Sequence, residues 1–155
     1  MNEKIERKFK HCVNVSDLKA TDIWFVWQDV ANWPNWNKGL AQCSITGPFV
    51  EGQTFSLLPK GEQSNATPFT STLTRVITNV AFDHITQVPW GTVNGSHYIN
   101  EVNDGLEIYH EIIAEVHPDK IDFFDSIIAQ KWKITLPAAL EEILLIARKN
   151  NAKGN

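Results

Sequence analysis

The sequence has the length and composition of one ordinary folded domain. It has 155 residues, of which 43% are hydrophobic and 21% are charged, close to the average for globular proteins. A chain of this length typically buries about 68–70% of the surface that its unfolded form exposes, which leaves room for a core with a pocket. We expect a single domain over residues 1–150 and a disordered tail over residues 151–155.

The charge pattern excludes nucleic acid and membrane insertion as expected modes of interaction. The formal net charge is −4, and the densest basic stretch, Lys4 to Lys10, is interspersed with Glu6. A nucleic-acid-binding domain needs a basic face, which this chain lacks. The charged N-terminus is not followed by an apolar secretory segment, and no wholly apolar run is longer than Ile143 to Ala147, which is too short to cross a bilayer. We therefore expect cytoplasmic residence.

The cysteines and histidines show no metal or cofactor motif. Cys12 and Cys43 fall in separate predicted strands and have neither a CxxC spacing nor a neighbouring histidine cluster. In a reducing compartment we expect two buried thiols instead of a disulfide. We expect no metal and no cofactor.

The N-terminal part of the chain predicts a strand followed by two short helices. Residues 5–15 alternate apolar and polar, the period of a half-buried strand. Ser16 is then a candidate N-cap for a helix over residues 16–30, whose apolar residues recur at helical spacing. Pro34 cannot continue this helix smoothly, so we expect a second short helix or turn around it.

The middle of the chain predicts six more strands joined by short turns. Gly, Pro, Asn and Asp separate the alternating runs, which indicates an antiparallel meander. The predicted ranges are 39–47, 52–58, 68–78, 80–90, 93–103 and 105–116.

The last third predicts a long amphipathic helix, because from about Asp119 to Lys149 the apolar residues recur every three or four positions. Pro137 lies inside it and predicts a kink near Leu136. The predicted fold is therefore α+β: a seven-stranded curved antiparallel sheet around a long kinked C-terminal helix, with two short helices between the first two strands. The space between sheet and helix is the default binding site.

Four motifs, in order along the whole chain, resemble the polyketide cyclase/dehydrase and lipid-transport group of the START and pollen-allergen superfamily, also called SRPBCC proteins. They are the tryptophan-rich elbow WFVWQDVANWPNW (24–36), the turn and strand of 47–55, the strand pair of 82–97 that ends in His97, and the Leu-Pro-x-x-Leu step of 136–140. The resemblance implies the helix-grip fold. It leaves the activity open, because members include cyclases, hydrolases, hormone and lipid binders, and chaperone activators.

The dipeptide Asp104-Gly105 predicts a two-residue type I′ hairpin, since both turn residues must adopt positive φ. Asn103 then pairs with Leu106. The pairs that follow are Glu101 with Ile108, Ile99 with His110, and His97 with Ile112. All of these residues share the apolar face, so a carboxylate and two imidazoles are expected to point into the cavity.

This predicted cluster of Glu101, His97 and His110 has three interpretations, which we favour in the following order. It is a structural hydrogen-bond network or a passive contact for a ligand; it recognises a polar group of the ligand; or it is catalytic, with one imidazole removing an α-proton and the other stabilising the enolate. A zinc site is the least favoured, because no third-ligand motif accompanies the histidines. His11, His84 and His117 show no constellation of their own.

The aromatic residues are assigned to two places. Trp24, Trp27, Trp33 and Trp36 are expected to pack the elbow onto the end of the sheet. Trp90 and Trp132 are expected on the cavity wall. Phe55, Leu57 and Ile128 are expected to join them there.

The strand predicted over residues 68–78 has two possible registers. One register turns Arg75 inward, and the other leaves it in solvent and puts Thr72, Thr74 and Val76 inside; we favour the second.

We therefore expect the chain to bind or carry a small, largely hydrophobic molecule. The expected ligand-binding residues are Phe55, Leu57, Trp90, His97, Ile99, Glu101, Ile108, His110, Ile112, Ile128 and Trp132. One alternative is a cofactor-independent enzyme of the cyclase or dehydratase type that uses His97 and His110. Another is an interaction module resembling the chaperone activators. The expected state is a monomer or a weak homodimer.

Overall fold

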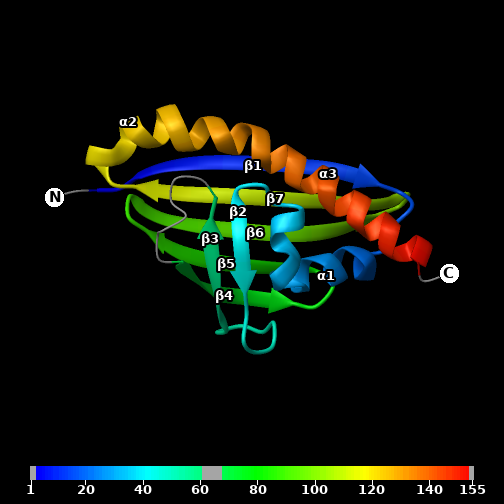
Figure 1. Ribbon diagram of the computed structural model, residues 1–155. Helices are drawn as coiled ribbons and strands as arrows, with labels where there is room; N and C mark the ends of the chain where they lie inside the picture. The colour runs from blue at the N-terminus through cyan, green and yellow to red at the C-terminus, as the bar shows by residue number, and fades with distance from the viewer. Residues whose placement is uncertain (1–2, 61–67, 154–155) are drawn as a thin grey trace.

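The computed structural model describes residues 3–60 and 68–153, which form a curved antiparallel sheet and a long C-terminal helix (Figure 1). The strands are β1 (Ile5–Val15), β2 (Leu40–Ser44), β3 (Thr54–Pro59), β4 (Phe69–Ile77), β5 (Ala81–Val88), β6 (Gly91–Val102) and β7 (Gly105–Val116). Their order in the sheet is β1-β7-β6-β5-β4-β3-β2, so β1 and β2 are its edges. The predicted sheet of seven antiparallel strands is confirmed.

Two short helices join β1 to β2, as predicted. They are α1 (Ala20–Gln28) and the 3-10 helix η1 (Val30–Asn35), which contains Pro34. The indole of Trp33 donates a buried hydrogen bond to the carbonyl of Trp27 (2.8 Å), which ties η1 back to α1. The elbow is therefore one packed unit.

The prediction that Ser16 caps the first helix is wrong. The helix α1 begins after Lys19, whose backbone N–H donates to the Asp22 carboxylate (2.8 Å). The preceding Asp17 is held by Arg148 of the C-terminal helix through two hydrogen bonds of 2.8 and 3.0 Å. This long-range ion pair connects the residues before α1 to α3.

The C-terminal helical segment consists of four consecutive pieces and runs along β1 and β7 to α1 (Figure 1). They are η3 (Pro118–Lys120), α2 (Ile121–Phe123), the π-helical turn η4 (Phe124–Ile128) and α3 (Ala129–Lys153). The π-helical turn η4 places Phe124 in the core. The helix α3 continues on both sides of Pro137, near which we expected a kink.

We expected a disordered tail from residue 151. This prediction is wrong for residues 151–153, which form the last turn of α3. Asn151 donates a hydrogen bond to Asp22 of α1 (3.2 Å), so this turn has a partner to pack on. Residues 154–155 lie outside the described residues.

The hairpin between β6 and β7 has a different register from the predicted one. Val102 pairs with Gly105, so the two-residue turn is Asn103-Asp104, and His97 pairs directly with His110. Gly105 has φ 149° and is the first residue of β7, where an added Cβ would collide with the Val15 carbonyl of β1. The positive φ and the close approach of β1 both require glycine here. The shift keeps the same residues on the inner face.

A bulge in β4 decides where Arg75 points. The pairing of β4 with β5 shifts between Leu73 and Arg75. Leu73 is therefore buried although Arg75, two residues later, is exposed and forms a bidentate ion pair with Asp83. The favoured solvated position of Arg75 is confirmed, but Thr74 is exposed and only Val76 of the expected inward set packs on the core.

Two hydrophobic clusters cover the inner face of the sheet. The larger one joins the elbow, the middle strands and the second half of α3, and contains all four elbow tryptophans. The smaller one lies at the other end, where Phe124 packs among Phe9, Trp90 and Trp132. Full burial of one such large side chain stabilises the fold by about 1.5–3 kcal/mol.

In the parts of the chain that the structure describes, no helix has the length and apolar character needed to span a membrane.

Cys12 of β1 and Cys43 of β2 are free thiols on opposite edges of the sheet. Burial raises the pKa of the Cys43 thiol to about 12, so this group stays protonated.

Candidate functional site

Four histidines form a row across the inner face of neighbouring strands. His11 of β1 pairs directly with His110 of β7, and His110 pairs directly with His97 of β6. His84 of β5 lies one step further, beside His97. Sequence reasoning singled out only the two middle members, and the interpretation of His11 and His84 as isolated is wrong.

The middle of this row is buried and closely packed. The exposed fraction is 7% for His97 and 1% for His110, whereas His84 and His11 keep partial exposure. The rings of His97 and His110 meet edge to face with centroids 4.2 Å apart. On its other side His97 stacks on Phe82, with centroids 4.3 Å apart and an angle of 8° between the rings.

A chain of hydrogen bonds connects this row to two buried hydroxyls. Thr86 Oγ1 donates to Ser71 Oγ (2.9 Å), and Ser71 Oγ lies 3.1 Å from Nδ1 of His84. Nε2 of His84 lies 3.4 Å from Nε2 of His97. A neutral imidazole carries one proton, so the tautomer of His84 determines which ring donates in the contact with His97.

Three elbow tryptophans cover the histidines. The rings of Trp27 and Trp36 lie 5.9 and 5.8 Å from His110, and Trp33 lies 5.9 Å from His84. The expectation that these tryptophans pack the elbow onto the sheet is confirmed. Their position over the histidines was not foreseen, because it depends on where η1 crosses the sheet.

Four polar atoms at this point are buried without a partner among the described residues. They are Nε1 of Trp27, Nε1 of Trp36, Nδ1 of His97 and Nε2 of His110. Each buried polar group that lacks a hydrogen bond costs about 1–3 kcal/mol. The rings that carry them are neighbours, because each of the two indoles has its ring centroid within 6.5 Å of both imidazoles.

The histidines of this spot are neutral at pH 7. Burial lowers the pKa of His84 to about 4 and that of His110 to about 3, with His84 and His11 contributing to the second shift. Burial, with His110 and His84, also lowers the pKa of His97 well below its ordinary value. Neutral imidazoles both donate and accept, so they suit an uncharged polar group such as a hydroxyl or a carbonyl.

Beyond His110 the inner face becomes apolar and more accessible. Ile112, the next inward residue of β7, is half-buried and belongs to neither cluster. Its neighbours across the sheet are Phe9 of β1 and Gly95 of β6. The ring of His84 lies over Gly95, where an added Cβ would come within 2.5 Å of Nε2. The surface next to the histidines is therefore apolar, and at Gly95 no side chain rises from the sheet.

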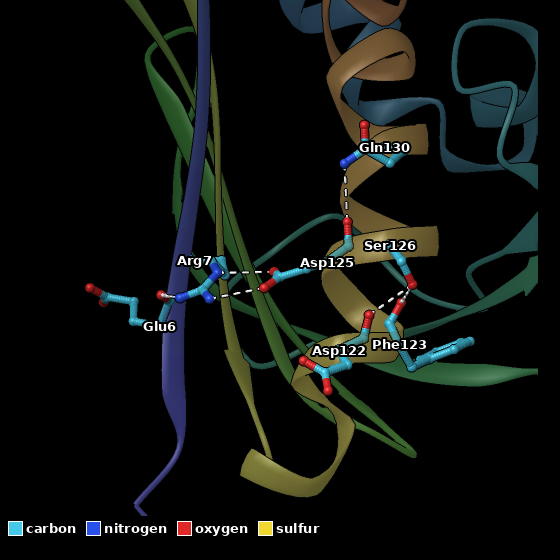
Figure 2. A network of polar contacts seen from close by, with 7 residues as sticks. All are labelled: Glu6, Arg7, Asp122, Phe123, Asp125, Ser126 and Gln130. Carbon is cyan, nitrogen blue, oxygen red and sulfur yellow. Dashed lines mark hydrogen bonds and ion pairs between the residues drawn. The ribbon is translucent and has the colours of Figure 1, made fainter.

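The far end of this apolar surface is closed by η4. Arg7 of β1 donates two hydrogen bonds of 3.0 Å to the Asp125 carboxylate, and the backbone carbonyl of Asp125 accepts from Gln130 (Figure 2). Figure 2 shows Arg7 reaching from the strand across to the helical turn. Behind this ion pair Phe9 packs edge to face on Trp132, with centroids 5.4 Å apart.

The predicted ligand-binding residues are divided between these places. Phe55, Leu57, Ile99 and Ile108 belong to the large cluster, and Phe55 packs on Trp33 and His84. Trp90, Ile128 and Trp132 belong to the small one. They therefore fall in two separate contact clusters on the inner face of the sheet. The expected cavity between them stays a prediction.

Glu101 does not join the histidines, although it lies on the same face. It is exposed near the end of β6 and lines an open groove with the start of α1 and the turn at Asn79. Glu101 follows His97 by four positions along β6, a distance of about 13 Å. The prediction that the Glu101 carboxylate joins the two imidazoles in one cluster is therefore wrong.

His84 and Ser71 are the members that sequence reasoning missed. His84 alternates with Phe82 and Thr86 in β5, so the alternation places all three on one face of that strand. That signal becomes informative only when β5 is known to pair with β6 and β4.

Comparisons with known proteins identify the fold. No protein-family model and no curated protein matches the sequence. The structure is similar to that of the di-domain ARO/CYC StfQ from the steffimycin biosynthetic pathway, with a TM-score of 0.73 at 13% identity over 97% of this chain. The chain spans 53% of StfQ. The chain has the helix-grip fold.

Two further structures share this fold along nearly their whole length. A point mutant of norcoclaurine synthase from Thalictrum flavum has a TM-score of 0.71 at 14% identity, covering 96% of this chain and 98% of that one. Ara h 8.0201 has a TM-score of 0.63 at 11% identity, covering 90% and 99%. Both likenesses agree with the helix-grip fold that the sequence motifs implied. At such identities the likeness defines the helix-grip fold and not the activity.

Proposed function

We propose that this chain binds a small, largely apolar molecule between the sheet and α3, with one uncharged polar group of that molecule at His97 and His110. The observation that carries the proposal is that these two histidines and the two indoles packed on them each hold a buried polar atom without a partner among the described residues. A hydroxyl or carbonyl placed there offsets the cost of leaving them unpaired. The apolar remainder lies over Ile112, toward Phe9.

The electrostatics support an uncharged ligand group. All three inner histidines have lowered pKa values, and an anion placed among neutral imidazoles and aromatic rings keeps a large desolvation cost. The aromatic rings supply flat apolar contacts, which favours ring-containing or lipid-like molecules. We also propose that the protein resides in the cytoplasm, which agrees with its two free thiols.

Catalysis is the second candidate, and the hydrogen-bonded chain from Ser71 through His84 to His97 favours it. Such a chain can move a proton from one imidazole to the next as the tautomers exchange. The low pKa values make these imidazoles weak bases at pH 7, so we rank binding first.

The test compares two variants on one strand. Ile112→Trp adds an indole to the inner face beside His110, whereas Ile113→Trp adds the same group to the outer face between Lys8 and Asn94. With N-phenyl-1-naphthylamine, an uncharged apolar fluorescent probe, we expect binding to be lost in Ile112→Trp and kept in Ile113→Trp. Circular dichroism checks that both variants fold.

Equal probe binding by both variants would show that the inner face is not the binding surface. Native mass spectrometry of protein from its own host then separates the two candidate functions. A co-purifying molecule whose mass is unchanged on incubation indicates a carrier, and a molecule that is converted indicates an enzyme.

A further inference from the structure

The outer face of the C-terminal helix carries a regular seam that the fold does not use. Its six residues are Ile127, Lys131, Ile134, Ala138, Glu141 and Leu145, and all are exposed. The exposed fraction reaches 73% for Ile134, 49% for Leu145 and 44% for Ile127. The opposite face of α3 is the buried one, with Leu140 and Ile143 fully covered.

The spacing of this seam is that of a coiled coil. Successive members are four, three, four, three and four residues apart, which is the seven-residue repeat that keeps one stripe facing a partner helix. The seam starts at Ile127 in the π-helical turn η4, and its other five members lie in α3. Three large aliphatic side chains in solvent at this spacing indicate a helical partner.

The seam is complementary to itself when reversed. In an antiparallel pair, Ile127 faces Leu145 of a second copy, Lys131 faces Glu141, and Ile134 faces Ala138. Each contact occurs twice because of the two-fold axis. A parallel pair puts Lys131 against Lys131 and Glu141 against Glu141, so the charges select the antiparallel arrangement.

We propose that the outer face of α3 is an isologous interface at which two copies of this chain pair their C-terminal helices antiparallel. The small Ala138 next to the axis lets the two helices approach closely. Six residues from each copy make a small interface, so the dimer dissociates on dilution. The seam carries one cation and one anion, which fits a second copy better than a lipid surface, where basic residues predominate.

The experiment is sedimentation velocity at low salt over a wide range of protein concentration. We expect the wild-type chain to shift from monomer to dimer as its concentration rises. Lys131→Glu and Glu141→Lys each place like charges at both ends of the interface, and we expect each to weaken the dimer about tenfold. The double variant K131E/E141K restores opposite charges and the wild-type dissociation constant.

The matched control is Lys133→Glu, which makes the same change in net charge at an exposed position of α3 outside the seam. We expect it to leave the dissociation constant within about twofold. A wild-type chain that stays monomeric, single reversals without effect, or a double variant that does not recover would each overturn the proposal. So would a monomer that sediments with anionic phospholipid vesicles and loses them on Ile134→Asp, because the seam would then face lipid.

Discussion

At the scale of single residues, Gly95 gives His84 the space that it occupies. The imidazole lies over the glycine of the neighbouring strand, between Nε2 of His97 and the hydroxyl of Ser71. A side chain on Gly95 would have to displace this ring and both of its contacts. The connection between the hydroxyls and the buried histidines therefore depends on a residue that has no functional group.

We expect Gly95→Ala to lower the free energy of unfolding by about 1–3 kcal/mol, the usual cost of overpacking a core. The added Cβ would come within 2.5 Å of Nε2 of His84. Urea denaturation measures the change. In a His84→Ala background the same substitution should cost much less, and an equal cost in both backgrounds would show that the strain lies elsewhere.

At the scale of elements, the ion pair of Arg7 with Asp125 joins the edge strand β1 to the π-helical turn η4 (Figure 2). Both side chains keep about two fifths of their surface exposed, at 39% and 44%, so solvent screens the pair. Its effect is therefore local. It holds η4, near the start of the C-terminal helical segment, against β1, which contributes Phe9 to the small cluster.

We expect Arg7→Ala to loosen η4 with little change in global stability. Amide hydrogen exchange of residues 121–128 should become severalfold faster, and added salt should produce the same trend in the wild-type chain. Arg75→Ala is the control, because it removes a similar bidentate pair, with Asp83, far from η4. Unchanged exchange in η4 after Arg7→Ala would mean that the aromatic packing of Phe124 alone holds this turn.

At the scale of the whole molecule, three neutral histidines on the inner face of the sheet make stability depend on pH. Their folded-state pKa values lie below the unfolded value of about 6.5, so between these values the unfolded chain binds more protons. The stability that they contribute is complete above pH 6.5. It is lost as pH falls toward the folded-state pKa values of about 4 for His84 and about 3 for His110.

We expect the free energy of unfolding to be level above about pH 7 and to fall by up to about 4 kcal/mol per pH unit below pH 6, about 1.4 for each histidine. Urea denaturation between about pH 7.5 and pH 4.5 measures this slope. The carboxylates of Asp17 and Asp125, with lowered pKa values, titrate below this window. His84→Gln should reduce the slope by about a third; a flat profile in the wild-type chain would contradict the burial of these neutral groups.

The sequence by itself determined the type, order and inner faces of the elements. Alternation over residues 5–15 and the helical spacing after Asp119 are local properties of the chain, and each follows from the geometry of one strand or one helix. The same local rule placed His97 and His110 on one face, although the predicted hairpin register was wrong. The motifs of the elbow and of the last helix added the helix-grip fold.

Only the tertiary structure decided which side chains meet. The row of His11, His110, His97 and His84 needs the pairing of four strands, and the tryptophans above it need the path of η1 over the sheet. The close contact of Gly105 with Val15 joins residues ninety positions apart in the chain. Such contacts depend on how distant segments pack, and a periodicity within one segment carries no information about its partner.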